Sequence, residues 1–207
     1  LPCCETFYGV LVHASITTPA VNSVQARVTS DRRAAEEPSV NRPEIEPNLA
    51  ATLLRRTHLN PERIALVFEE QEITFAQFGD RVRRQARLFR SGGVCVGDRV
   101  GYLGFNHPAL LETMFAAQAL GAIFVPLNYR LTAQELTFIV NDAGIHTLVV
   151  DDALRPVLQP ALPDLCCSHY FSSESEAVGW RHLVTERTAA EPLPAAVSVD
   201  QHDVAVI

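Results

Sequence analysis

The stretch Ala119-Leu-Gly-Ala-Ile-Phe-Val-Pro-Leu-Asn-Tyr-Arg-Leu-Thr-Ala-Gln-Glu-Leu136 decides the fold class of this chain. Residues 122–126 form a continuous apolar block, which is typical of a strand covered on both faces of a sheet. Thr132-Ala-Gln-Glu135 then has the form of a capping box, in which the Thr and Glu side chains accept hydrogen bonds from free amides at a helix start. The stretch therefore predicts a buried strand followed by a helix, as in α/β folds.

The residues before this stretch repeat the same alternation. A second capping box, Thr74-Phe-Ala-Gln77, predicts the start of a helix that ends at Gly92-Gly93. A strand is expected at 99–104, and a helix from Pro108 to Leu120 begins with Asn106 or His107 as its cap. That helix is apolar almost all round, so we expect it to be buried on most sides.

The residues on either side extend the pattern. After the helix that starts at Thr132 and stops at Gly144, residues 146–150 form another buried strand, closed by Asp151-Asp152. Near the start, Asn48 caps an expected helix ending before Asn60, then 64–68 is a strand and 69–72 a polar turn. Strands that alternate with helices at these lengths predict right-handed crossovers and a mainly parallel sheet flanked by helices.

The two ends of the chain have a less regular hydrophobic pattern than the residues between them. Residues 1–47 show no sustained period and turn polar and proline-bearing from Ser30, so we expect a poorly structured tail or linker ahead of a folded part at 48–207. Residues 153–200 carry only weak signals, and 203–207 is predicted to be a further apolar strand. Because the chain begins at Leu1 and stops inside that strand, we expect an incomplete piece of a longer polypeptide.

Composition excludes several functional classes. The 207 residues have a formal net charge of −7, which argues against a nucleic-acid-binding protein. All 17 residues counted as Lys or Arg are arginine, so this chain cannot by itself supply a mechanism that needs a lysine. The longest apolar region, 109–127, contains Glu112, Gln118 and Pro126, and it predicts no transmembrane segment. The five cysteines lack zinc-site spacing, which favours a reducing, cytoplasmic setting.

Three segments resemble one known family. Ile73-Thr-Phe-Ala-Gln-Phe78, Gly97-Asp-Arg-Val100 and above all residues 119–136 are similar to the amino-terminal part of the adenylate-forming enzymes. That superfamily comprises acyl- and aryl-CoA synthetases, luciferases and the adenylation domains of peptide synthetases. Pro126-Leu127-Asn128 followed by Tyr129-Arg130 is more like the ligases for fatty or related acids. Gln77 and Ala109 depart from the common pattern at positions that look structural.

The resemblance implies an ATP-dependent acyl-CoA synthetase. Such an enzyme joins a small-molecule carboxylic acid to CoA through an acyl-adenylate, using ATP, Mg²⁺ and CoA. The family's phosphate loop with its lysine follows a strand that resembles 203–207, so we expect the chain as given to be inactive. Two alternatives are a non-catalytic α/β interaction module from a truncated or degenerate relative, and an adenylation domain of a peptide synthetase.

Arg130 is the candidate cofactor-binding residue. In CoA ligases that this sequence resembles, an arginine in the corresponding Pro-Leu-Asn-x-Arg stretch lies close to the phosphates of CoA, for which a guanidinium is well suited. The alternative is a surface arginine that pairs with Glu135 or is solvated. No residue of this chain is assigned a catalytic or metal-binding role.

Other polar groups receive structural interpretations. A basic run on the helix after Thr74 is interpreted as a solvated helix face opposite the apolar stripe; it consists of Arg81, Arg83, Arg84, Arg87 and Arg90. Asp151-Asp152 is interpreted as a cap between strand and loop. The histidines from His107 onward are scattered without the spacing of a metal or general-base site. Cys95 and Cys166-Cys167 are interpreted as ordinary cysteines, without a cation or a helix start to activate them.

Overall fold

The computed structural model describes residues 48–200 and 202–207. The tail or linker predicted for residues 1–47 lies outside the described residues, so that boundary stays a prediction. In chain order, the elements are α1 (Leu49–Leu59), β1 (Ile64–Phe68), β2 (Gln71–Thr74), α2 (Phe75–Ser91), β3 (Arg99–Leu103), α3 (Pro108–Ala119), β4 (Ile123–Leu127), α4 (Ala133–Asp142), β5 (Ile145–Val150), α5 (Arg155–Leu158), a 3-10 helix (Gln159–Asp164), β6 (His169–Ser172), β7 (Arg181–His182) and α6 (Leu183–Ala189).

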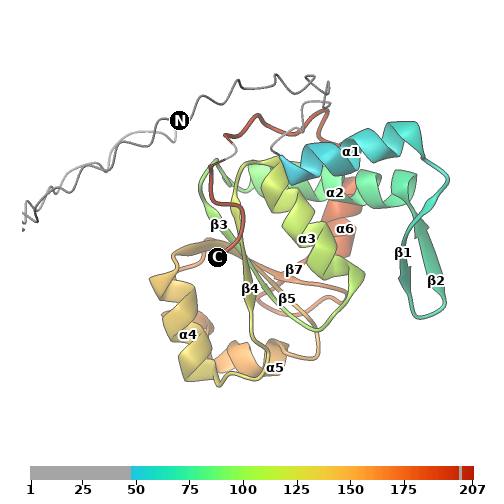
Figure 1. Ribbon diagram of the computed structural model, residues 1–207. Helices are drawn as coiled ribbons and strands as arrows, with labels where there is room; N and C mark the ends of the chain where they lie inside the picture. The colour runs from blue at the N-terminus through green and yellow to red at the C-terminus, as the bar shows by residue number, and fades with distance from the viewer. Residues whose placement is uncertain (1–47, 201) are drawn as a thin grey trace, which may run out of the picture. The chain divides into compact units, whose positions relative to one another are not determined.

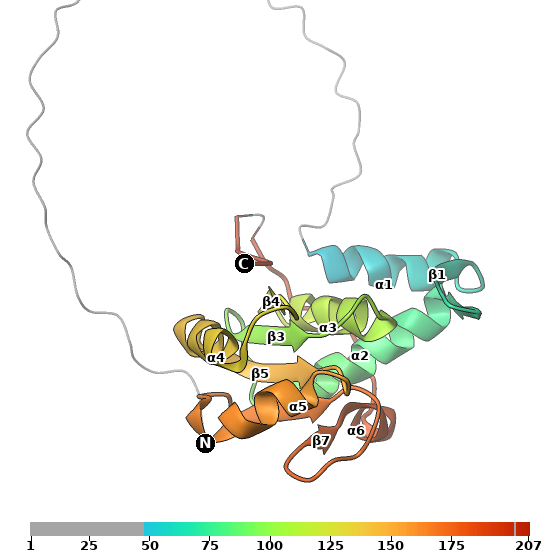
Figure 2. The same ribbon diagram turned by 90° about the horizontal axis from the view of Figure 1, so that it is seen from below.

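A parallel five-stranded sheet forms the centre of the fold, with the strand order β4-β3-β5-β6-β7 (Figure 1). One core lies between the sheet and α2, α3 and α6, and includes Phe89, Tyr102 and Leu183. A second core lies on the other face under α4 and α5, and includes Leu136 and Leu158 (Figure 2). The prediction of a mainly parallel sheet flanked by helices is confirmed.

Side chains at the helix starts fix where the helices begin. Thr74 and Thr132 both form complete capping boxes, with Gln77 and Glu135 as their partners. Asn48 caps α1 by accepting from the amides of residues 50 and 51, and its own amide group donates to the carbonyl of Gln118 at 3.0 Å. The cap of α3 is His107, whose Nδ1 accepts from the amide of Ala109 at 3.2 Å.

Two local predictions need correction, a turn at 69–72 and a strand at 203–207. The polar turn expected at 69–72 is shorter, because Gln71 and Glu72 pair with β1 in an antiparallel hairpin. Gln71 and Glu72 are both exposed and only Ile73, the next residue, is buried, so the polar run carried no alternating pattern that would indicate a strand. The strand expected at 203–207 is reduced to one parallel bridge between Val206 and Phe124, on the open edge of β4.

The basic run on α2 is only partly solvated, because a later segment of the chain covers part of this face. Only Arg90 of the five arginines is exposed. The Arg84 guanidinium donates to the carbonyl of Ala190 at 2.7 Å, and the backbone carbonyl of Arg83 accepts from the amide of Leu193 at 3.0 Å. The segment that covers this face lies about a hundred residues further along the chain, which no helical period of α2 could indicate.

Gly104 offers a test of packing at the end of β3. A β-carbon at this position would lie 2.5–2.7 Å from three atoms of the Tyr102 phenol, which is only 1% exposed. We expect Gly104→Ala to lower the free energy of unfolding by about 1–3 kcal/mol, the range for overpacked cores, as measured by urea unfolding. Tyr102→Leu should reduce this cost in a double-mutant cycle; a cost for Gly104→Ala that is independent of residue 102 would contradict the packing argument.

Candidate functional site

The carboxyl ends of the parallel strands form the candidate site. In open α/β sheets, ligands bind beyond this edge, because the loops and helix starts that can hold them gather there. Here the edge carries the residues after Leu103 of β3, Leu127 of β4, Val150 of β5 and Ser172 of β6. Two features occupy it: an exposed aromatic and arginine surface beyond β3 and β4, and a cavity beyond β5 and β6.

Arg130 lies on the first of these features. The turn that holds it is fixed by Asn128, whose Oδ1 accepts from the Arg130 amide at 3.0 Å. The guanidinium carbon is 5.3 Å from the centre of the Tyr129 ring, and that ring lies 4.8 Å from the ring of Phe105 at the end of β3. Arg130, Tyr129 and Phe105 are all exposed, so the edge presents a cation beside two aromatic rings.

Glu135 takes no part in holding Arg130. Its carboxylate accepts from the amide and the hydroxyl of Thr132, at 2.9 and 2.8 Å. The backbone and side-chain hydrogen bonds from Thr132 lower the pKa of Glu135. Arg130 is therefore exposed and makes no ion pair with Glu135, and its role as a ligand-binding residue stays a prediction.

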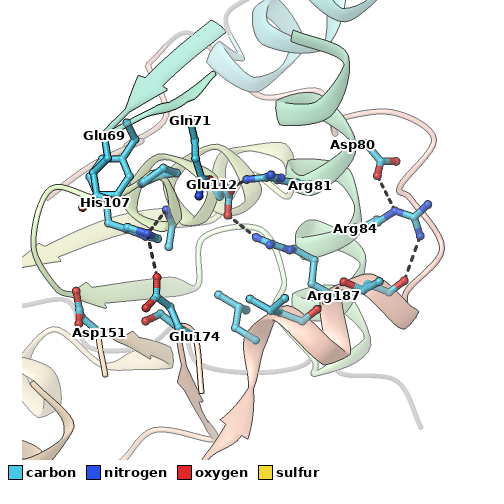
Figure 3. Close-up of a pocket in the computed structure, with 17 residues that line it drawn as sticks. Glu69, Gln71, Asp80, Arg81, Arg84, His107, Glu112, Asp151, Glu174 and Arg187 are labelled. Carbon is cyan, nitrogen blue, oxygen red and sulfur yellow. Dashed lines mark hydrogen bonds and ion pairs between the residues drawn. The ribbon is translucent and has the colours of Figure 1, made fainter. Parts of the chain in front are cut away.

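The second feature is a cavity of about 820 Å³ (Figure 3). The hairpin, α2, the start of α3, α6 and the loops after β5 and β6 enclose it. Its charged and polar lining residues include Glu69, Gln71, Asp80, Arg81, Arg84, His107, Glu112, Asp151, Glu174 and Arg187. Sequence reasoning singled out His107, Asp151 and the arginines of α2 separately, and the fold brings His107, Asp151 and two of those arginines, Arg81 and Arg84, to one place.

A buried ion-pair network forms the floor of this cavity. Glu112 is 2% exposed, and its two oxygens accept from Arg187 and, at 3.2 Å, from Arg81. Gln85 accepts from Arg187 at 3.4 Å and donates to Thr113 at 2.9 Å, so the network ties α6 to α2 and α3. Paired, hydrogen-bonded charges of this kind are the form in which buried ions occur in proteins.

His107 bridges three elements at the cavity. Because its Nδ1 accepts from the Ala109 amide, the ring proton is assigned to Nε2, which lies 3.1 Å from Oε1 of Glu174. Its ring also meets the edge of Phe68 in the hairpin, with the ring centres 4.8 Å apart. Both ring nitrogens of His107 therefore already have a protein partner, and we interpret this histidine as structural.

The other histidines form no metal site. The rings of His146 and His169 lie 5.8 Å apart, and across the described ranges there is no cluster of three or more metal-ligating side chains.

The two aspartates after β5 have different surroundings. Asp152 acts as a loop cap, as predicted, accepting from the hydroxyls of Ser172 and Ser175 and from the amide of Glu174. Burial raises its pKa, but these hydrogen bonds and Arg155 together outweigh it and leave the pKa below the usual value. Asp151 lines the cavity, and one of its oxygens accepts from the amide of Ala153 at 3.0 Å.

Two further groups are held in their neutral forms. Burial, followed by the nearby Cys166, raises the pKa of Cys167 to about 12, so this thiol is not activated. Burial, followed by the carboxylates of Asp151, Glu174 and Glu112, raises the pKa of Tyr102 far above its ordinary value. The Tyr102 hydroxyl is buried and has no hydrogen-bond partner among the described residues.

Sequence reasoning missed Glu112 and Arg187 as interacting groups. The available signal was Glu112 itself, a carboxylate in a helix that is otherwise apolar nearly all round. A charge there must find a cation when the helix is buried. Its main partner, Arg187, is 75 positions away in a region with weak periodicity, so the pairing depends on the fold.

Comparison with known proteins gives the family. A model of the AMP-binding enzyme family matches residues 53–207, which is most of the chain. The chain therefore belongs to the AMP-binding enzyme family. Across the part that the structure describes, no helix combines the length and apolar character that crossing a membrane requires.

Individual relatives are CoA ligases by name. Feruloyl-CoA synthase from Amycolatopsis sp is 45% identical over 96 residues, covering 46% of this chain and 20% of the relative. A long-chain-fatty-acid–CoA ligase from Thermus thermophilus is 32% identical over 142 residues, covering 63% of this chain and 26% of the relative. The chain thus spans about a fifth to a quarter of the length of these curated relatives.

Solved structures show the same fold. An anthranilate CoA ligase in complex with anthranoyl-AMP matches with a TM-score of 0.72 at 22% identity, over 76% of this chain and 31% of that one. A long-chain-fatty-acid CoA ligase from Rhodopseudomonas palustris, described there as putative, matches with a TM-score of 0.66 at 27% identity, over 72% of this chain and 38% of that one. Both matches confirm the amino-terminal α/β architecture of the ligase fold.

Proposed function

We propose that this chain is the amino-terminal portion of an ATP-dependent acid–thiol ligase that makes acyl-CoA. The observation that carries the proposal is the family match over residues 53–207, together with relatives that are named as CoA ligases. In this proposal, residues 48–207 build the sheet unit that precedes the phosphate loop. The reaction is placed in a reducing cytoplasm, in keeping with a set of five cysteines that lacks the spacing of a zinc site.

The proposed reaction has two steps. An oxygen of the substrate carboxylate attacks the α-phosphorus of ATP, and pyrophosphate leaves to give an acyl-adenylate. The CoA sulfur, after losing its proton, then attacks the acyl carbon, and AMP leaves with the electron pair of the broken bond. Magnesium, when bound, neutralises phosphate charge. Since the described residues contain no cluster of three or more metal-ligating side chains, no step is assigned to a metal ligand of this chain.

Arg130 fits the CoA side of this reaction. Its guanidinium is exposed at the carboxyl end of β4 and has no acidic partner within the described ranges. The hydrogen bond from its amide to Asn128 fixes the backbone, and the Tyr129 ring supports the side chain. We assign Arg130 to a phosphate of CoA, because a guanidinium can donate two parallel hydrogen bonds to phosphate oxygens.

The named relatives indicate which acids are candidate substrates and which thiol could accept the acyl group in a second candidate function. The relatives include ligases named for ferulate and for long-chain fatty acids, so both aryl and alkyl carboxylic acids are proposed substrates. A fatty acid–[acyl-carrier-protein] ligase from Streptomyces coeruleorubidus is 31% identical over 126 residues. That similarity favours, as the second candidate, transfer of the acyl group to a carrier protein in place of CoA.

The adenylation step tests the proposal. A polypeptide that carries these residues and spans the length of the relatives is assayed for exchange of labelled pyrophosphate into ATP, with fatty acids, aryl acids and amino acids as separate substrates. We expect exchange with a fatty or aryl acid. Exchange with amino acids alone would instead support a peptide-synthetase adenylation domain, and no exchange with any acid would support a non-catalytic interaction module.

A further inference from the structure

The cavity beyond β5 and β6 has walls of opposite charge. Figure 3 shows Arg81, Arg84 and Arg187 on the side formed by α2 and α6, while Asp151 and Glu174 lie on the side formed by the loops after β5 and β6. Arg130 is not among the lining residues, so the cavity does not belong to the surface assigned to CoA. Its volume of about 820 Å³ falls within the usual range for small-molecule sites.

The arginine side of the cavity has an excess of positive charge. Arg81 and Arg187 converge on a single carboxylate, Glu112, and each uses its Nη1 atom for that contact. A guanidinium has five N–H donors, so both side chains keep further donors beyond this contact. Arg84 adds nothing to the excess, because it pairs with Asp80 at 2.8 Å.

The opposite side has an excess of negative charge. Asp151 makes no ion pair within residues 48–200 and 202–207. One of its oxygens accepts from the Ala153 amide, and the other oxygen accepts no hydrogen bond from the described residues. Glu174 pairs with none of the arginines among these residues, and its Oε1 lies 3.1 Å from Nε2 of His107.

We propose that this cavity binds a small zwitterion, with its carboxylate against Arg81 and Arg187 and its ammonium group against Asp151. A simple anion would face Asp151 and Glu174, and a simple cation would face the two arginines. A ligand that carries both charges satisfies both walls, and opposite charges at both ends also fix its orientation. The ligand class is therefore an amino-carboxylate whose ammonium and carboxylate groups are separated by a carbon chain.

Three probes of equal chain length test how much each of the two ligand charges contributes to binding. By isothermal titration calorimetry at low salt, 6-aminohexanoate should bind at least tenfold more tightly than hexanoate, which lacks the ammonium group, or hexylamine, which lacks the carboxylate. The affinity for 6-aminohexanoate should also weaken as salt is added. If the zwitterion binds no more tightly than either singly charged probe, or none of the three binds, the proposal is wrong.

Variants assign each charge to its wall. Arg81→Gln should weaken binding of 6-aminohexanoate about tenfold, and Asp151→Asn should have a similar effect. Arg90→Gln is the matched control, because Arg90 lies on the same helix but is exposed and does not line the cavity. Thermal unfolding of each variant confirms that it is folded. Equal losses for Arg81→Gln and Arg90→Gln would show a non-specific charge effect and overturn the proposal.

Discussion

Replacing Glu112 with alanine is expected to lower the free energy of unfolding by about 3–5 kcal/mol, the usual cost of removing one partner from a buried ion pair. The carboxylate is 2% exposed and accepts from two guanidiniums, one of which, Arg187, is 8% exposed. Without Glu112, that guanidinium stays buried with only Gln85 as a weak partner at 3.4 Å. Urea unfolding followed by circular dichroism measures the loss.

Two comparisons separate the ion pair from a general effect of losing a glutamate. Glu191→Ala, at an exposed position beyond α6, should change stability by less than about 0.5 kcal/mol. The double variant Glu112→Leu with Arg187→Leu should be more stable than Glu112→Ala alone, since removing both charges leaves none of this pair buried. A double variant that is less stable than the single variant would contradict this explanation.

Replacing Arg130 with alanine is expected to raise the apparent KM for CoA about tenfold, which corresponds to about 1.4 kcal/mol of lost binding. That energy is near the lower end of the range for a hydrogen bond to a charged group, as suits an exposed side chain. Adenylate formation, measured by pyrophosphate exchange in the enzyme that spans the relatives' length, should be nearly unchanged. Only the second step involves CoA.

Two further variants serve as controls for Arg130→Ala: one keeps the charge at position 130, and the other removes an exposed arginine at a different position. Arg130→Lys should recover part of the CoA affinity, because the ammonium keeps the charge without the two-pronged geometry. Arg90→Ala, another exposed arginine, should leave the KM for CoA as it is. An unchanged KM in Arg130→Ala would remove Arg130 from the CoA site, and a large loss of pyrophosphate exchange would assign it a role in the first step.

Much of the sheet and of the helix boundaries could be predicted from the sequence. The capping boxes at Thr74 and Thr132 act within one helical turn. Gly93 and Gly144, which both have positive φ, follow directly after the C-cap residues of α2 and α4. The apolar block at Ile123–Leu127 marks a strand between two other layers. These features depend on neighbouring residues only, so sequence reasoning could find them.

Features that depend on distant residues could not be predicted. Strands β6 and β7 have four and two residues, too few for a period; β6 pairs with the edge of β5, and β7 pairs with the edge of β6. The arginines of α2 look like a solvated face until α6 and the segment after it cover them. The cavity, likewise, unites the hairpin, α2 and α6 with loops at the sheet edge, so its charges could be read only from the fold.

The products of the complete reaction test the central proposal most directly. The enzyme is incubated with ATP, CoA and the fatty or aryl acid that supports pyrophosphate exchange, and its products are identified by mass spectrometry. We expect an acyl-CoA thioester with an equal amount of AMP. Formation of ADP and phosphate, or adenylate formation without any thioester on CoA, would contradict the assignment of this chain to an acyl-CoA ligase.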